Sequence, residues 1–171
     1  KKDNFDNIFK DKMNLAALVR KNDELVYTRY NQKRQIDSNT MLHGASMSKT
    51  ALSTAIGILL CNGKIDSLSD ELGKYSPSLA KTPYSKISIK NTLQMNSGVE
   101  SIKSDLKFRR KLNQIAQGMR KHEGKADVFK AISLLKGNDR EQGSKFFYNS
   151  SDPYALSILI SDLTKKPASE I

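Results

Sequence analysis

Two short strand-like segments separated by a polar turn predict a β-hairpin near the start of the chain. Residues 14–20 and residues 24–30 have the pattern of two strands, and the polar triplet Lys21-Asn22-Asp23 supplies the turn between them. Before the hairpin, residues 4–12 have the spacing of a short amphipathic helix. A lone hairpin is marginal in water, so we expect other elements to cover it.

A long helix is predicted from about Ser46 to Cys61. The segment Ala51–Cys61 is apolar on nearly all sides, which is typical of a helix buried at the centre of a domain. The pair Asn62-Gly63 supplies the residues that commonly end a helix.

The rest of the chain alternates between loops and helices. We expect turns and loops over residues 64–86, a helix over Ser88–Asn96 that ends at Ser97-Gly98, helices over 104–119 and 126–136, and a loop over 137–143.

The last long helix is predicted to begin at Pro153, with Asp152 as its cap. The side chains Tyr154, Leu156, Ile158, Leu159 and Leu163 would form its apolar face. A further helix is predicted to start at Lys165-Lys166-Pro167.

The charge balance changes this picture little. The chain has 171 residues with 29 Lys and Arg against 18 Asp and Glu, a formal net charge of +11. The densest basic run, Lys103–Lys130, contains few aromatic residues and no signature of a nucleic-acid-binding fold. We therefore interpret the charge as a solvated lysine-rich surface and expect no nucleic-acid partner.

Cysteine and histidine counts exclude other classes. A single cysteine, Cys61, permits no internal disulfide, and two histidines with one cysteine disfavour a zinc site built by the protein. No apolar run reaches the roughly 18 residues of a membrane span. The first residues lack the apolar core of a signal peptide, although a signal removed earlier would leave no trace.

The candidate chemistry lies in Ser46-Met47-Ser48-Lys49, an S-x-x-K pattern. Positions i and i+3 share a helix face, so the Ser46 hydroxyl can meet the Lys49 amine. A serine needs a base to become a nucleophile, and lysine serves as that base when burial or the helix N-terminus lowers its pKa. The Ser46 N–H could stabilise an oxyanion. His43, three residues earlier, is a weaker candidate base.

With this motif, several stretches in the same order resemble the serine β-lactamase and penicillin-binding-protein hydrolases. Within them, the chain resembles the branch of class C β-lactamases, esterases and 6-aminohexanoate-dimer hydrolases. The matching stretches are Leu15–Tyr30, His43–Thr50, Leu59–Tyr75, Ile87–Val99 and Phe146–Lys166.

The resemblance implies an α+β, β-lactamase-like fold. Its second motif, Tyr-x-Asn, reads Tyr148-Asn149-Ser150 here. This makes Tyr148 the second base beside Ser46 and Lys49. Ser150 replaces the usual Asn as a substrate-binding residue, which suits esterases and amidases better than β-lactamases.

The third motif of these enzymes, Lys-Thr-Gly or His-x-Gly on a late strand, does not occur after Tyr148. We therefore expect residues 1–171 to be the N-terminal part of one catalytic domain. Within it, residues 1–45 would form the helix and strand pair and residues 46–171 the nucleophile helix and helical region. The remaining sheet strands would lie in a missing C-terminal part, without which we expect no turnover.

The resemblance predicts a serine hydrolase that acts on a small ester or amide without a cofactor or metal. Two alternatives remain: a D-Ala-D-Ala carboxypeptidase or penicillin-binding protein, and a non-catalytic peptidoglycan-binding relative. We expect a periplasmic or secreted location after signal removal, with the cytoplasm as the alternative.

Overall fold

The computed structural model describes residues 14–42, 44–99, 132–133, 135 and 137–171. The chain divides into two compact units, residues 1–45 and residues 46–171. The helices predicted over 4–12 and 104–119 lie outside the described residues, as does most of the helix predicted over 126–136.

The described part of the first unit is built around an antiparallel hairpin. Strand β1 (Ala16–Lys21) pairs with strand β2 (Glu24–Tyr30), so the predicted hairpin is confirmed. Asn22 and Asp23 both adopt left-handed backbone angles, with φ of 49° and 63°. Two such residues in succession suit a tight hairpin turn, because their twist matches that of the strands.

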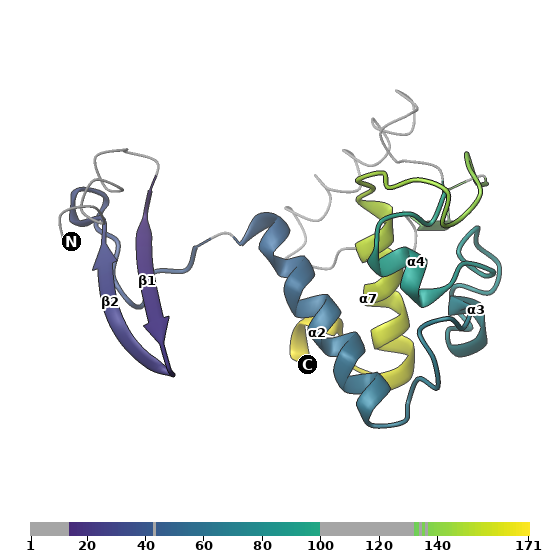
Figure 1. Cartoon of the computed structure of the whole chain (residues 1–171), viewed down its shortest axis with the longest axis horizontal. Helices are drawn as coiled ribbons and strands as arrows, with labels where there is room; N and C mark the ends of the chain where they lie inside the picture. The colour runs from purple at the N-terminus through teal and green to yellow at the C-terminus, as the bar shows by residue number, and fades with distance from the viewer. Residues whose placement is uncertain (1–13, 43, 100–131, 134, 136) are drawn as a thin grey trace. The chain divides into compact units, whose positions relative to one another are not determined.

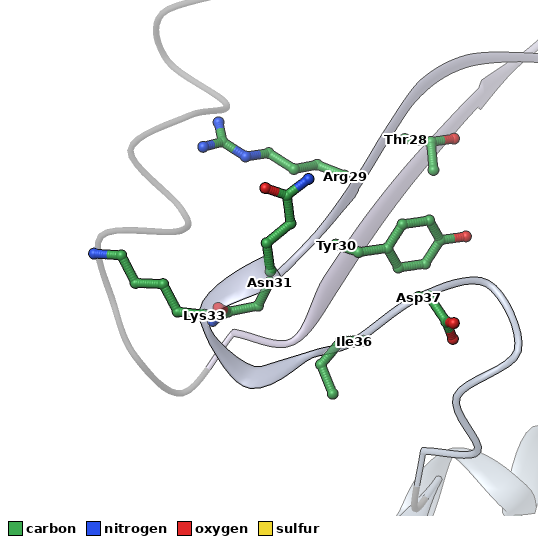
Figure 2. Close-up of a pocket in the computed structure, with 8 residues that line it drawn as sticks. Thr28, Arg29, Tyr30, Asn31, Lys33, Ile36 and Asp37 are labelled. Carbon is green, nitrogen blue, oxygen red and sulfur yellow. The ribbon is translucent and has the colours of Figure 1, made fainter.

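The end of β2 and the loop after it enclose a hollow of about 610 Å³ (Figure 2). The short 3-10 helix η2 (Gln32–Arg34) forms part of this loop. The lining residues are Thr28, Arg29, Tyr30, Asn31, Gln32, Lys33, Ile36 and Asp37.

The second unit is helical in its described part. It contains α2 (Ser48–Cys61), α3 (Leu72–Tyr75), α4 (Ile89–Leu93), α7 (Ser151–Thr164) and the 3-10 helix η4 (Ala168–Glu170). Helix α7 packs against the other three α-helices, as Figure 1 shows. A hairpin in one unit and helices in the other confirm the predicted mixed α+β class.

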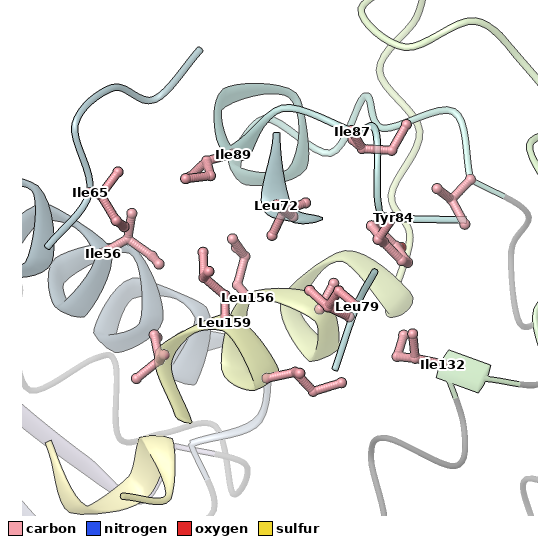
Figure 3. Close-up of a cluster of buried hydrophobic side chains, with 14 of the residues drawn as sticks. Ile56, Ile65, Leu72, Leu79, Tyr84, Ile87, Ile89, Ile132, Leu156 and Leu159 are labelled. Carbon is pink, nitrogen blue, oxygen red and sulfur yellow. The ribbon is translucent and has the colours of Figure 1, made fainter. Parts of the chain in front are cut away.

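The core of the second unit forms where α7 meets its neighbours (Figure 3). Leu156 and Leu159 of α7 lie among apolar side chains from α2, α3, α4 and the loops between them, including Ile56, Leu72 and Ile89. Among the residues that the structure describes, no helix is long and apolar enough to cross a membrane.

The expected central burial of the helix that follows the S-x-x-K pattern holds for one face only. Only Ala55, Ile56 and Leu59 of α2 are buried, and Ile58 is 47% exposed. Helix α2 has α7 on one side, and apolar composition alone does not determine which faces of a helix are covered. The predicted end at Asn62-Gly63 is confirmed: Asn62 is the C-cap and Gly63 has a φ of +67°.

The predicted start of the last helix is wrong. Helix α7 begins at Ser151 with Ser150 at the N-cap position, two residues earlier than expected. The Asp152 side chain is completely buried and accepts hydrogen bonds from other segments, so it does not cap the helix. Tyr154, predicted on the apolar face, is 39% exposed.

The helix predicted over Ser88–Asn96 is shorter than expected. Helix α4 ends at Leu93, and Ser88 caps its start by accepting a hydrogen bond from the Asn91 N–H. Gly98 therefore does not cap it. Gly98 has a φ of +74°, and a Cβ there would lie 2.2 Å from the Arg140 carbonyl oxygen. The glycine permits this close approach of two loops.

Candidate active site

Three side chains predicted to carry the chemistry lie together in the second unit. The Ser46 Oγ lies 2.7 Å from the Tyr148 hydroxyl, and either atom can donate that hydrogen bond. The Lys49 Nζ donates to the Ser46 Oγ across 3.1 Å. Lys49 Nζ also lies 5.2 Å from the centroid of the Tyr148 ring, within cation–π distance.

A change of helix type places Ser46 beside Lys49. Ser46 lies in a 3-10 turn, η3 (Ala45–Met47), that runs directly into α2. Residues three positions apart lie on the same side of a helical backbone, so the Ser46 and Lys49 side chains can meet. Ala45, just before Ser46, has a φ of +42°, an unusual angle for a residue with a Cβ. The nucleophile candidate thus follows a sharp backbone turn.

The residues before and after Tyr148 both form hydrogen bonds that fix its position. The Phe147 N–H donates to the Met95 carbonyl across 2.8 Å, and the Asn149 side-chain amide donates to the Val99 carbonyl across 3.1 Å. These bonds attach the segment before α7 to the segment after α4. They hold the tyrosine ring beside the start of α2, although Tyr148 and Ser46 are 102 residues apart in the sequence.

The site is accessible in the described structure. Ser46 is exposed, Lys49 is half-buried and Tyr148 is 45% exposed. The hydroxyl of Ser46 can therefore meet a ligand from outside while it contacts both partners. The hollow beside β2 is lined by residues 28–37 alone and includes none of the three.

The arrangement can move a proton away from a serine. The Ser46 hydroxyl contacts an amine and a phenol, and each of these groups accepts a proton in its basic form. A serine hydroxyl becomes a nucleophile when an adjacent base takes its proton, and Ser46 has two candidate bases beside it.

Ser150 lies two residues after Tyr148, at the N-cap of α7. Its side chain forms no capping hydrogen bond and is half-buried. Contact of Ser150 with a substrate stays a prediction. His43, the weaker candidate base, lies outside the described residues.

Sequence reasoning missed the residues that support Tyr148. Asn149 is 2% exposed and also accepts a hydrogen bond from the Ser151 N–H. Behind it, the buried Asp152 accepts hydrogen bonds from the hydroxyls of Tyr84 and Ser97, each across 2.6 Å. Burial raises the pKa of Asp152 to about 6 and raises the pKa of Tyr84 above its usual range.

Two other carboxylates, Asp66 and Asp70, share one lysine partner. The Lys74 ammonium lies 2.7 Å from Asp66 and 2.9 Å from Asp70. Hydrogen bonds from Lys74 lower the pKa of Asp66, and the hydroxyl of Tyr75 lowers that of Asp70. Both groups stay ionised at neutral pH and are poor proton donors. In the part of the chain that the structure describes, no three His, Cys, Asp or Glu side chains form a metal-binding cluster.

With the fold and the geometry described, a comparison with protein-family models identifies the family of this chain. The family model for beta-lactamase matches residues 5–170. The chain belongs to the beta-lactamase family. Comparison of the sequence with curated proteins finds no significant match.

Solved structures show the same fold. One, from Bacillus anthracis and provisionally assigned as a 6-aminohexanoate-dimer hydrolase, is 21% identical with a TM-score of 0.69; the match covers 96% of this chain and 44% of that one. A D-stereospecific amidohydrolase from Streptomyces sp. is 22% identical with a TM-score of 0.58, covering 73% and 38%. The octameric penicillin-binding protein homologue from Pyrococcus abyssi is 19% identical with a TM-score of 0.60, covering 91% and 36%. The chain spans less than half the length of each.

Proposed function

We propose that the protein is a serine hydrolase that cleaves a small ester or amide through an acyl-enzyme on Ser46. The observation that carries this proposal is the double contact of the Ser46 Oγ, 2.7 Å from the Tyr148 hydroxyl and 3.1 Å from the Lys49 Nζ. Membership of the beta-lactamase family supports it.

The proposed reaction has two halves. In the first, the Ser46 Oγ attacks the substrate carbonyl carbon while its proton passes to Lys49 or Tyr148 in its basic form. The Ser46 N–H is one donor to the tetrahedral oxyanion. Collapse breaks the bond to the alcohol or amine, which leaves with the transferred proton. In the second half, water attacks the acyl-enzyme and releases the acid and Ser46.

An amide or ester substrate is favoured over a β-lactam. Ser150 stands where the related motif has Asn, so an amide-recognising side chain is replaced by a shorter hydroxyl.

Kinetics with p-nitrophenyl acetate and a p-nitroanilide test the proposal in the intact protein. Ser46→Ala is expected to reduce turnover to background, and Tyr148→Phe to reduce kcat by about 10²- to 10⁴-fold. Ser53→Ala is the matched control, because its hydroxyl donates to the Thr50 carbonyl of the same helix. Full activity in Ser46→Ala would refute the mechanism.

The two alternative functions predict other outcomes, which are measured with a D-Ala-D-Ala peptide and with penicillin. A D-Ala-D-Ala carboxypeptidase would release D-alanine from a diacylated Lys-D-Ala-D-Ala peptide and would turn over the ester poorly. A non-catalytic peptidoglycan-binding relative would bind penicillin tightly without gaining its mass.

A further inference from the structure

The segment 147–152, which contains Tyr148, forms hydrogen bonds with the segment 95–99. Phe147 bonds to Met95, Asn149 to Val99 and Asp152 to Ser97. Tyr148 lies inside this series, with its neighbours attached on both sides. The position of its hydroxyl beside Ser46 therefore depends on how firmly the segment 95–99 is held.

The segment 95–99 is itself fixed on its far side. The N–H groups of Asp139 and Arg140 both donate to the Gly98 carbonyl, across 2.9 and 3.2 Å. Gly98 has left-handed backbone angles and no room for a Cβ against Arg140. Segment 95–99 therefore lies between two hydrogen-bonded neighbours, residues 139–140 on one side and residues 147–152 on the other.

Asp152 is the ionisable residue in this network of hydrogen bonds. A single carboxylate oxygen, Oδ1, accepts from Tyr84 and from Ser97. The Ser97 hydroxyl also accepts from the Val99 N–H across 3.2 Å, and the Val99 carbonyl accepts from Asn149. A path of hydrogen bonds therefore runs from Asp152 through Ser97 and Val99 to the residue next to Tyr148.

Packing alone does not account for a carboxyl group at this position. The side chain is completely buried, and its second oxygen, Oδ2, has no hydrogen-bond partner among the described residues. A buried carboxyl with so few donors is costly, whereas an ionised acceptor makes shorter and stronger hydrogen bonds than a neutral one. The ionised carboxylate therefore forms stronger hydrogen bonds with the Tyr84 and Ser97 hydroxyls than a neutral group would.

We propose that Asp152, in its ionised form, is a positioning residue that holds Tyr148 in contact with Ser46 through Ser97 and Asn149. This inference rests on the proposed acyl transfer at Ser46. Asp152 does not touch the nucleophile. It acts by fixing the backbone on either side of the tyrosine.

Few groups control the charge of Asp152. The hydroxyl of Tyr84 comes from the loop before α4, and the hydroxyl and N–H of Ser97 come from the segment after it. Among the described residues, no lysine or arginine of α2, α3, α4 or α7 forms an ion pair with it. Burial raises its pKa to about 6, and the hydrogen bonds from Ser97 and Tyr84 oppose that rise.

The test compares variants of the intact protein by kcat and KM for p-nitrophenyl acetate across pH 4.5–8. Asp152→Asn keeps the shape and the acceptor but removes the charge. We expect kcat to fall about 10-fold or more with KM changed less than threefold. In the wild type we expect kcat to rise with pH about a midpoint near 6 as Asp152 ionises, and we expect this rise to be absent in Asp152→Asn. Asp162→Asn is the matched control: this acid on the same helix bonds to Ser76 and Ser78, away from the tyrosine.

Tyr84→Phe gives an independent readout that retains the carboxyl group. Loss of its hydrogen bond is expected to move the midpoint near pH 6 to higher pH. The proposal is overturned if folded Asp152→Asn keeps the kcat and pH profile of the wild type, or if Tyr84→Phe leaves the midpoint in place. If Ser46→Ala is inactive while these variants behave as the wild type, this inference fails and the proposed hydrolase stands. Activity in Ser46→Ala instead removes the proposed function.

Discussion

At the scale of single residues, Ser46, Lys49 and Tyr148 form one mutually contacting set. Each pair is in contact: Ser46 with Tyr148, Lys49 with Ser46, and Lys49 with the face of the Tyr148 ring. Groups in such contact act as a unit, so the loss of one alters what the others can do.

This contact predicts strong non-additivity between Lys49 and Tyr148. The double variant Lys49→Ala/Tyr148→Phe is expected to lose about as much kcat as the more damaging single variant. A double-mutant cycle with p-nitrophenyl acetate measures it. Losses that multiply fully would show that the two side chains act independently.

Asp152 makes the stability of the fold depend on pH. Burial raises its pKa from 3.8 to about 6, so the folded state binds a proton more tightly than the unfolded state. The stabilisation is therefore fully present below about pH 4 and is lost as the pH rises through about 6; the shift corresponds to about 3 kcal/mol.

Urea unfolding of the wild type and of Asp152→Asn between pH 4 and pH 7.5 measures this effect. The wild type is expected to lose stability relative to the variant as the pH rises. Parallel curves for the two proteins would contradict the assignment. The ionised carboxylate thus lowers stability, in keeping with a residue retained for function.

At the scale of elements, the site depends on how α7 and the loops before it are held. Gly98 is the tightest point, because its φ is positive and a Cβ would meet the Arg140 carbonyl. Gly98→Ala is expected to lower the free energy of unfolding by about 2 kcal/mol or more. Thermal or urea unfolding measures the loss.

Gly57→Ala is the matched control for this change. Gly57 lies within α2, and a Cβ there meets nothing within 4 Å. This variant is expected to gain about 0.5–1 kcal/mol, because alanine favours a helix over glycine. An equal effect at the two positions would show that the contact at Gly98 does not strain the fold.

Local signals predicted the elements whose determinants lie close together in the sequence. The hairpin follows from two strand-like segments and the polar turn between them, and the end of α2 follows from Asn62-Gly63. The Ser46–Lys49 contact follows from spacing of three residues. Tyr148 came from the family resemblance alone, since its partner is 102 residues away.

Long-range contacts explain what the sequence did not predict. Asp152 has the residue type and position of a helix cap, but its partners Tyr84 and Ser97 lie 68 and 55 residues away and draw it into the core. The apolar residues of α2 gave no sign that α7 covers one face only. Such choices depend on neighbours that a local pattern does not contain.

At the scale of the whole molecule, the net charge of +11 is interpreted as a solvated surface. We therefore expect any association with a 20-base-pair DNA duplex to be weak and to disappear between 50 and 200 mM salt. Fluorescence anisotropy over this range measures it. Sub-micromolar affinity at 150 mM salt would instead indicate a nucleic-acid partner.

The central claim is that Ser46 is the nucleophile, the residue that forms the covalent bond to the substrate. Mass spectrometry of the protein after incubation with a fluorophosphonate probe tests this claim most directly. The account predicts a single adduct on the peptide that contains Ser46, none in Ser46→Ala, and an unchanged adduct in Ser53→Ala. An adduct that persists in Ser46→Ala, or no adduct in the wild type, would contradict it.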